Sequence, residues 1–302
     1  VFAVNKLDAL EDAAKPETAG QATLAFAHIS GALARFARAA GITVTATVPI
    51  SALIGHNVVD PVEGWCGYTG ESLLDILGQL PVTPADTGLP FAQPVQWVEK
   101  FSASSDTSQG RRVFWGRVAA GQAQVGQQVK LLPSGQTATI AQVLGHTRVP
   151  RSVPAGHSAG VVLDREVDVS RGDWLLALEP AQAVADDDFD SPAASDSLTP
   201  SRELRATVAW MDDEPLVAGR VYWALHGHRW VKAKVRRVVH RLDINTLAEE
   251  DADTLPANAI GHIELLLQEA IPVRAFAQSR VQGALVLVDT ASNRTAGAVL
   301  IH

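Results

Sequence analysis

The hydrophobic pattern at the start of the chain predicts a buried strand followed by a helix. Residues 1–4 form an unbroken apolar run with no polar lead-in, which is typical of a strand inside a parallel sheet. Ile29, Leu33 and Phe36 then recur at helical spacing, and Gly41 supplies a residue suited to a helix C-terminus. We therefore expect one strand and one amphipathic helix in this region.

The same order repeats over the next forty residues or so. β-Branched residues alternate from 42 to 50 and predict a second strand. Thr69 is the expected N-cap of a short helix. This helix carries Leu73, Leu74, Leu77 and Leu80. Strand, helix, strand and helix in this order indicate a parallel α/β sheet, and prolines and glycines between 81 and 90 mark its end. Residues 1–83 are expected to form this domain.

Beyond residue 91 the pattern changes to short alternating strands separated by Gly, Pro and Ser turns. We predict an antiparallel β-barrel over 91–180 and a second over 202–302. Between them, residues 181–201 are rich in Asp, Ala, Ser and Pro and are interpreted as a solvated acidic linker. This cluster lacks the spacing and the glycine of a calcium-binding loop, so the linker is preferred over a calcium site.

Composition narrows the classes of partner. The 302 residues are 47% hydrophobic and carry 25 Lys and Arg against 33 Asp and Glu, a net charge of −8. An acidic surface repels phosphate backbones, so the composition disfavours nucleic acid as a partner. No apolar run approaches the roughly 20 residues that cross a bilayer. The single cysteine, Cys66, excludes internal disulfides and multi-cysteine metal sites. These features predict a cytoplasmic protein with no membrane partner.

The clearest chemical motif is Asn-Lys-Leu-Asp, which supplies Asn5, Lys6 and Asp8 directly after the first predicted strand. Ligand sites of open parallel sheets lie at the carboxyl ends of the strands. Guanine presents two adjacent donors, N1–H and the 2-amino group, and one carboxylate accepts both, whereas adenine has no such pair. Asp8 is therefore the candidate selector of guanine. Asn5 is a candidate for tying the loop and touching the base edge, and the Lys6 stem for covering the base plane.

Ser51, Ala52 and Leu53 follow the second predicted strand and should lie beside this motif. The backbone N–H of Ala52 is a candidate donor to the guanine O6 atom. A tetrapeptide of this type also occurs by chance, and the alternative is an ordinary loop in which Asp8 caps a helix. The second segment at the neighbouring strand end favours the nucleotide site.

Phosphate chemistry requires a further loop of the type G-x-x-x-x-G-K-[ST]. The 302 residues contain no Gly-Lys pair. Asp75 and Gly78 imitate the Asp-x-x-Gly motif that serves magnesium, but they lie on the predicted short helix after the guanine motif. Because the chain also starts inside an apolar strand, we expect the missing loop to lie upstream of Val1. We assign no catalytic residue and no metal ligand to this chain.

Motifs in the two predicted barrels and near the end of the first domain carry a family resemblance. Gly116, Gly121 and Gly126, with valines between them, resemble the second-domain signature of translational GTPases. Matches more specific than this superfamily signature are Trp65 with Thr69 and 73–74, then 131–135, 167–173, 210–211, 215–216, 243–247, and Asp289 with 293–295. By these residues, from Val1 to His302, the chain resembles the GTP-binding large subunit of bacterial ATP sulfurylase, a family similar to elongation factor Tu.

This resemblance implies a partial P-loop GTPase domain followed by two antiparallel β-barrels like elongation-factor domains II and III. It implies GTP and Mg²⁺ as cofactors of the intact protein. It also implies a separate catalytic subunit that makes adenylyl sulfate from ATP and sulfate, coupled to GTP hydrolysis, in sulfate assimilation and cysteine biosynthesis. Two alternatives stay open: an elongation-type translation factor that binds tRNA, and a non-catalytic module that docks through its barrels.

Three histidines, His226, His228 and His240, lie within a basic stretch. No carboxylate or thiol close to them in the sequence completes a tetrahedral metal set, so a solvated strand face is preferred over a metal site. The basic stretch is also a candidate contact for an acidic surface of the catalytic subunit. Cys66 is interpreted as packing rather than as a nucleophile, because no motif places a base beside it.

Overall fold

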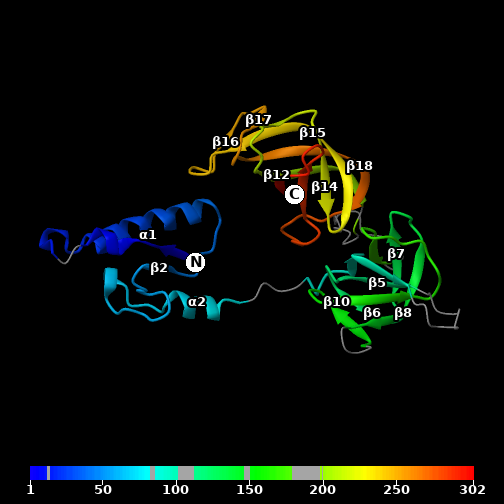
Figure 1. The fold of residues 1–302 in the computed structure, drawn as a ribbon, viewed down its shortest axis with the longest axis horizontal. Helices are drawn as coiled ribbons and strands as arrows, with labels where there is room; N and C mark the ends of the chain where they lie inside the picture. Colours follow the sequence, from blue (N-terminus) through cyan, green and yellow to red (C-terminus); the bar gives the residue numbers. More distant parts are fainter. Residues whose placement is uncertain (12–13, 82–85, 101–111, 146–149, 179–197, 199) are drawn as a thin grey trace, which may run out of the picture. The chain divides into compact units, whose positions relative to one another are not determined.

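The computed structural model describes residues 1–302 apart from 12–13, 82–85, 101–111, 146–149, 179–197 and 199. Most of the predicted acidic linker, 181–201, thus lies outside the described residues. The chain divides into two compact units: Val1–Thr83 with Asp243–Ala248, and Pro84–Leu242 with Glu249–His302 (Figure 1). No helix in the described part of the chain is long and apolar enough to cross a membrane.

The first unit has the predicted order of strand, helix, strand and helix. Its elements are β1 (Phe2–Val4), η1 (Leu7–Leu10), η2 (Pro16–Thr18), α1 (Gln21–Ala39), β2 (Thr47–Pro49), η3 (Trp65–Gly67) and α2 (Leu73–Gln79). β1 and β2 are parallel, as expected, with Phe2 opposite Thr47 and Val4 opposite Pro49. The second strand is shorter than the predicted 42–50, because β1 offers only three residues for it to pair with.

Helix α1 is held at its N-terminus by a residue that is distant in sequence. The carboxylate of Glu11 accepts hydrogen bonds from the backbone N–H groups of Gly20 (2.9 Å) and Ala22 (3.2 Å). A carboxylate at this end satisfies free helical N–H groups and interacts favourably with the helix dipole. Ala22 and Ala37 are buried on the inner face, and Phe26 packs there against Val4 and Cys66.

The predicted cap of the second helix is wrong. The N-cap of α2 is Ser72, whose hydroxyl oxygen accepts a hydrogen bond from the Asp75 N–H at 3.2 Å. A capping side chain has to occupy the residue immediately before the first helical turn, and Thr69 lies too far from Leu73 to do so. Of the leucines assigned to this helix, Leu74 and Leu77 are exposed, and the buried residue of the helix is Ile76.

The second unit contains two large antiparallel sheets, in the two regions where the sequence predicts antiparallel barrels. The first sheet has the order β3-β11-β7-β8-β10-β5-β4. Its strands are β3 (Ala92–Pro94), β4 (Trp97–Lys100), β5 (Arg112–Arg117), β7 (Gln128–Leu132), β8 (Thr137–Leu144), β10 (Ser158–Leu163) and β11 (Trp174–Ala177), beside a small pair β6 (Gln122–Gln124) and β9 (Ser152–Pro154). Phe114, Leu131 and Ile140 are among the fully buried residues of its core.

The second sheet closes into a barrel of six strands, because β14 pairs with both β15 and β19. Its strands are β12 (Pro200–Trp210), β14 (Val221–His226), β15 (Arg229–Leu242), β18 (Ile260–Pro272), β19 (Ala284–Asp289) and β20 (Thr295–Ile301), with β16 (Glu249–Glu250) at an edge and a small pair β13 (Leu216–Val217) and β17 (Thr254–Leu255). Trp210 packs edge-on against Tyr222 in the barrel core.

The boundary of this barrel differs from the prediction. β12 starts at Pro200, opposite Pro272 of β18, so the last two residues assigned to the acidic linker belong to the sheet. Composition could not show this, because Pro and Ser are typical of linkers and their strand pairing depends on a partner about seventy residues away.

Two buried side chains link the sheets of the second unit. Trp174 at the start of β11 stacks on the imidazole of His226 at the end of β14, with ring centroids 5.1 Å apart. His226 is fully buried and its Nε2 lies 3.0 Å from the Gln282 carbonyl oxygen. Burial lowers the pKa of His226 to about 4. The expected solvated position of His226 is therefore wrong.

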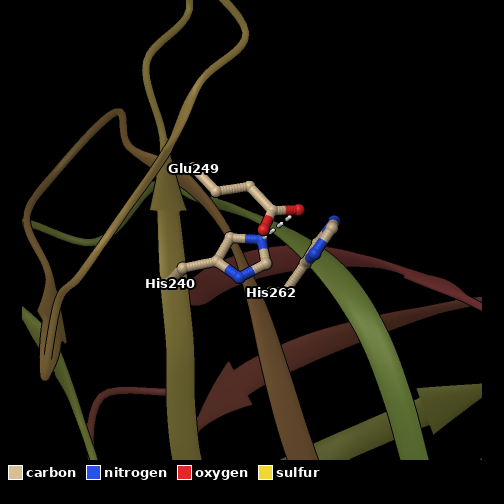
Figure 2. A group of neighbouring side chains, drawn as sticks. All are labelled: His240, Glu249 and His262. Atoms are coloured by element: carbon tan, nitrogen blue, oxygen red, sulfur yellow. Dashed lines mark ion pairs between the residues drawn. The ribbon is translucent and has the colours of Figure 1, made fainter.

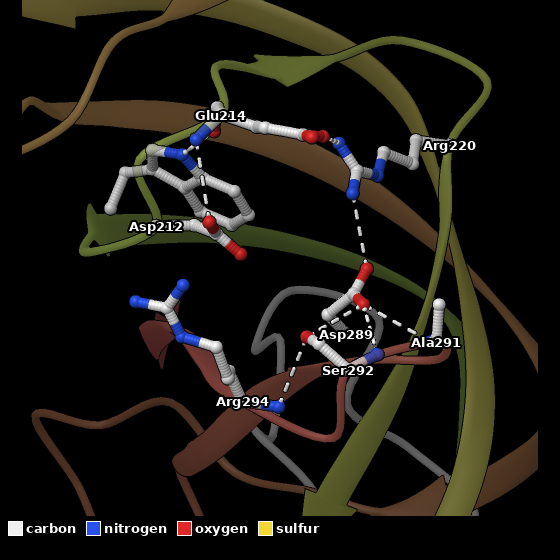
Figure 3. A network of polar contacts seen from close by, with 8 residues as sticks. Asp212, Glu214, Arg220, Asp289, Ala291, Ser292 and Arg294 are labelled. Atoms are coloured by element: carbon white, nitrogen blue, oxygen red, sulfur yellow. Dashed lines mark hydrogen bonds and ion pairs between the residues drawn. The ribbon is translucent and has the colours of Figure 1, made fainter.

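A turn at the end of β19 is built on one carboxylate (Figure 3). Asp289 Oδ1 accepts hydrogen bonds from the N–H groups of Ala291 (3.0 Å) and Ser292 (2.8 Å) and from the Ser292 hydroxyl (2.9 Å). Its other oxygen pairs with Arg220 of the turn before β14 at 3.1 Å. These donors stabilise the charged carboxylate and hold the pKa of Asp289 well below its usual range.

Candidate functional site

Parallel pairing of β1 and β2 brings the two predicted guanine segments to one sheet edge. The Ile50 N–H donates to the Val4 carbonyl at 2.8 Å, at the point where both strands end. Asn5 and Ser51 are the next residues of their respective loops. The structure therefore places these loops side by side, as expected from the position of both motifs after strands.

Asn5 links the two loops directly. Its side-chain oxygen accepts one hydrogen bond from the Lys6 N–H at 2.8 Å and another from the Ala52 N–H at 3.1 Å. The predicted loop-tying role of Asn5 thus has a concrete geometry. The Ala52 N–H, which the sequence suggested as a donor to a base carbonyl, is already engaged here, so a base oxygen would have to share this donor with Asn5 or replace it.

Lys6 and Asp8 present free polar groups at this edge. Lys6 has a left-handed backbone (φ 66°) and an exposed side chain. Asp8 lies in the first turn of η1, is half-buried, and its carboxylate has no hydrogen bond or ion pair with any residue that the structure describes. Asp8 caps no helix through its side chain, because the N-cap of η1 is Lys6 and has no side-chain capping bond. The carboxylate is available to an external pair of donors.

Ser51 and Leu53, the other two residues of the segment 51–53, differ in their exposure to solvent. Ser51 is fully buried, and its hydroxyl oxygen accepts from the Ile54 N–H at 3.3 Å, so it shapes the loop from within. Leu53 is 87% exposed at the surface of the same loop. An apolar side chain left in solvent beside polar groups is suited to cover one face of a planar base.

Asn57 is a supporting residue that the sequence analysis missed. It is fully buried with a positive φ of 53°. Its amide nitrogen donates to the Pro49 carbonyl at 3.1 Å and its oxygen accepts from the Val62 N–H at 2.6 Å. Asn57 therefore fixes the exit of β2 and, through it, the loop that carries Ala52. The only sequence signal was an asparagine just after a glycine-containing turn, which is typical of many surface loops.

The Asp75 motif has a structural use. The Ser72 hydroxyl donates to the Asp75 carboxylate at 2.6 Å, while the Asp75 N–H donates back to the same hydroxyl oxygen. This reciprocal pair stabilises the start of α2. Asp75 is thus engaged in capping the helix, which fits the interpretation that this Asp-x-x-Gly sequence only imitates the magnesium motif.

The basic stretch of β15 is largely neutralised. Arg229 pairs with Asp173 and Glu269, Arg237 with Glu264, and Arg241 with Glu250. Val231, Ala233 and Val235 are buried and alternate with the exposed Lys232 and Lys234. Lys232 and Lys234 form no ion pair with any described residue, so these two lysines carry the free positive charge of this face.

Comparison with known proteins identifies relatives along the whole chain. A family described as GTP-eEF1A C-terminal domain-like matches residues 203–302. Sulfate adenylyltransferase subunit 1 of Laribacter hongkongensis is 33% identical over 303 residues, covering 100% of this chain and 56% of the relative. The bifunctional enzyme CysN/CysC of Xylella fastidiosa is 33% identical over 299 residues, covering 99% of this chain and 43% of the relative.

Solved structures agree on the fold. Sup35 complexed with GDP superimposes with a TM-score of 0.58 at 18% identity, and covers 99% of this chain and 68% of that one. Sup35 complexed with GMPPNP superimposes with a TM-score of 0.57 at 20% identity. The present chain spans about half the length of the curated relatives that it matches. The resemblance expected from the sequence is confirmed: the chain is homologous, along its whole length, to the sulfate adenylyltransferase subunit 1 family.

Proposed function

We propose that the edge formed by Asn5, Lys6, Asp8 and the loop 51–53 recognises the guanine base of GTP. The observation that carries this proposal is the Asn5 to Ala52 hydrogen bond, which joins two segments of the predicted guanine motif beside the unpaired carboxylate of Asp8. Asp8 accepts the N1–H and 2-amino donors of guanine, Lys6 and Leu53 cover the ring, and Ala52 shares its N–H with O6. Ser51 supports the loop. A bidentate contact of this kind discriminates by about 1–3 kcal/mol, by analogy with base readout in DNA.

In this proposal residues 1–83 are the C-terminal half of a P-loop GTPase domain. The phosphate and magnesium ligands would then be supplied by sequence outside these 302 residues. Bound GTP would supply the energy that drives a switch when its γ-phosphate is lost. In this chain the residues named above hold and orient the base. The residues assigned here carry no step of phosphate chemistry.

The biological role that follows is that of a GTP-hydrolysing subunit of sulfate adenylyltransferase, paired with a catalytic subunit that forms adenylyl sulfate from ATP and sulfate. The whole-chain homology to proteins named subunit 1 supports this assignment, since that name implies a second subunit in those relatives. The two antiparallel sheets would then provide docking surface. Sedimentation velocity of the chain mixed with a sulfate adenylyltransferase catalytic subunit tests the pairing, and two independently sedimenting species would contradict it.

Base recognition is tested separately by exchanging the hydrogen-bonding pattern of Asp8. The variant Asp8→Asn offers one acceptor and one donor, which match N1–H and the 2-carbonyl of xanthine instead of guanine. Saturation-transfer NMR with the 302-residue chain should detect guanosine monophosphate with the natural sequence and xanthosine monophosphate with the variant. Asp60→Asn, a change at an exposed carboxylate of the same unit, is the matched control and should keep the guanine preference. Equal responses of the natural chain to guanosine and adenosine monophosphates would refute the assignment.

A further inference from the structure

The outer face of the six-stranded barrel carries a cluster of two imidazoles and a carboxylate that the guanine site does not use. His240 of β15, His262 of β18 and Glu249 of β16 each offer one ligand atom, and these three atoms lie within 4.8 Å of one another. Figure 2 shows the His240 and His262 rings side by side with the Glu249 carboxylate above them. From this geometry we propose that His240, His262 and Glu249 form a binding site for a divalent transition-metal ion, with Zn²⁺ as the best match.

The strand register explains how both histidines reach the same face. His240 and His262 lie directly opposite each other in the β15–β18 ladder, with ring centroids 4.3 Å apart. One residue, Val239, is skipped between the pairs that Val238 and His240 make. Side chains alternate along a strand, so regular pairing would turn His240 to the same side as the buried Val238. The extra residue of this bulge turns His240 to the outer face instead.

The backbone beside the cluster is also close-fitting. A Cβ atom on Gly261, the residue before His262, would lie 2.6 Å from the His240 carbonyl oxygen. Glycine at this position allows the two histidine-bearing strands to approach each other. The approach of the rings thus depends on two local departures from a regular ladder, a bulge on one strand and a glycine on the other.

One nitrogen of the cluster lacks a hydrogen-bond partner. His240 Nε2 lies 3.3 Å from Glu249 Oε1, but no hydrogen bond forms, so this buried nitrogen has no hydrogen-bond partner among the described residues. The His240 side chain is only 12% exposed, whereas that of Glu249 is 63% exposed and free to adjust. A buried polar atom without a partner is costly, and a metal ion would satisfy it.

The donor set matches zinc chemistry. Two imidazoles and one carboxylate are the protein ligands of a common class of zinc site that leaves a fourth position open. In a tetrahedral shell with bonds of 2.0–2.1 Å, ligand atoms are about 3.3 Å apart, so the distances between the present ligand atoms have to shorten by at most about 1.5 Å. Magnesium is disfavoured, because it prefers oxygen ligands in octahedral geometry.

The surroundings leave room for a fourth ligand. The His302 ring lies 4.8 Å from that of His262, but its Nε2 is already 2.8 Å from the Thr207 hydroxyl. His262 and His302 also line a cavity of about 190 Å³ together with Arg205 and Arg237. His240 and Glu249 do not line this cavity, but the Glu249 side chain is 63% exposed, so a water molecule from solvent can complete the shell.

Isothermal titration of Zn²⁺ into the metal-stripped, tag-free 302-residue chain tests the proposal. We expect one equivalent to bind, and excess Mg²⁺ to leave the titration unchanged. Removal of a group that only hydrogen-bonds to a metal ligand already weakens metal binding about 10–100-fold. Glu249→Gln and His262→Gln remove the ligands themselves, so each should weaken zinc binding at least tenfold. His28→Gln, a change at an exposed histidine of α1, is the matched control and should bind as the natural chain does.

A second readout separates ligation from folding. Glu249 is an exposed residue of a two-residue edge strand, so Glu249→Gln should retain the natural circular dichroism spectrum and melting temperature in the absence of metal. Zn²⁺ should slow hydrogen exchange at residues 249–250 in the natural chain but not in this variant, because the ion ties β16 to the barrel. Less than one equivalent of zinc bound, or equal affinity in the natural chain, Glu249→Gln and His262→Gln, would overturn the proposal and leave the cluster as an ion pair.

Discussion

Asn5 and Ala52 are 47 positions apart in sequence, yet the Asn5 side-chain oxygen accepts a hydrogen bond from the Ala52 backbone N–H at 3.1 Å. The same oxygen also accepts from the Lys6 N–H. One side chain thus fixes the relative positions of the Asp8 loop and the loop 51–53. The proposed guanine edge depends on this link before any nucleotide arrives.

Removal of this link should loosen the site. In Asn5→Ala the Ala52 N–H loses its partner, and the free energy of unfolding of the first unit should fall by about 0.5–1.5 kcal/mol. Hydrogen exchange at the Ala52 amide should become faster. Asn5→Asp is the matched control, because a carboxylate oxygen accepts the same two hydrogen bonds and should keep this amide protected. Unchanged exchange in Asn5→Ala would show that the two loops are held by other contacts.

The polypeptide as printed should not hydrolyse GTP. Its 302 residues contain no Gly-Lys pair and therefore no loop of the type that cradles phosphates. Phosphate release from GTP and Mg²⁺ should equal that of a protein-free blank, and GTP should bind little better than guanosine monophosphate. Turnover that persists through purification and disappears with Asp8→Asn would contradict this prediction.

His226 should make the second unit sensitive to mild acid. Its pKa is lowered from 6.5 to about 4 by burial. Between these values the unfolded chain takes up a proton that the folded chain excludes, so stability is full above pH 6.5 and falls as the pH drops toward 4. The loss amounts to about 3 kcal/mol at most. Urea unfolding of the barrels from pH 7.5 to 4 measures it. His226→Phe, which can still stack on Trp174, should make the free energy of unfolding nearly independent of pH in this range. An unchanged pH dependence in this variant would show that another group causes it.

Asp289 should make the stability of the second unit depend on pH in a lower range than His226 does. Hydrogen bonds from Ser292 and Ala291, together with Arg220, lower its folded-state pKa below the ordinary 3.8. A lowered carboxyl pKa stabilises the fold above the unfolded value, and this stabilisation is lost as pH falls through the folded value. Asp289→Asn should therefore be less stable than the natural chain at pH 7, and the difference should shrink below pH 4. Equal stability of the two proteins at pH 7 would contradict the role of this carboxylate.

The pattern of apolar and polar residues predicted the order of strands and helices in the first unit and the meeting of the loops that follow its two strands. Apolar residues 1–4 and the β-branched run before Ser51 indicated parallel strands, and parallel strands place their following loops at one edge. That the Ala52 N–H is already bonded to Asn5 could not be predicted, because it depends on a side-chain rotamer. The role of Asn57 could not be predicted for a similar reason, because its hydrogen bonds to Pro49 and Val62 depend on the conformation of the loop between them.

The histidines show a different limit. Sequence proximity grouped His226, His228 and His240, whereas the fold separates them: His226 is buried against Trp174, and His240 faces His262 across a ladder. Partners on neighbouring strands are decided by register, and the register of β15 and β18 includes bulges. A bulge adds one residue and leaves no clear trace in the pattern of apolar and polar positions.

Amide-resolved NMR of the 302-residue chain, titrated with guanosine monophosphate and, separately, with adenosine monophosphate, tests guanine recognition most directly. Our account predicts that the guanine nucleotide shifts the Lys6, Asp8 and Ala52 amides, that the adenine nucleotide leaves them unchanged, and that Asp8→Asn abolishes the guanine response. Equal shifts with both nucleotides, or guanine-dependent shifts confined to residues outside these two loops, would contradict it.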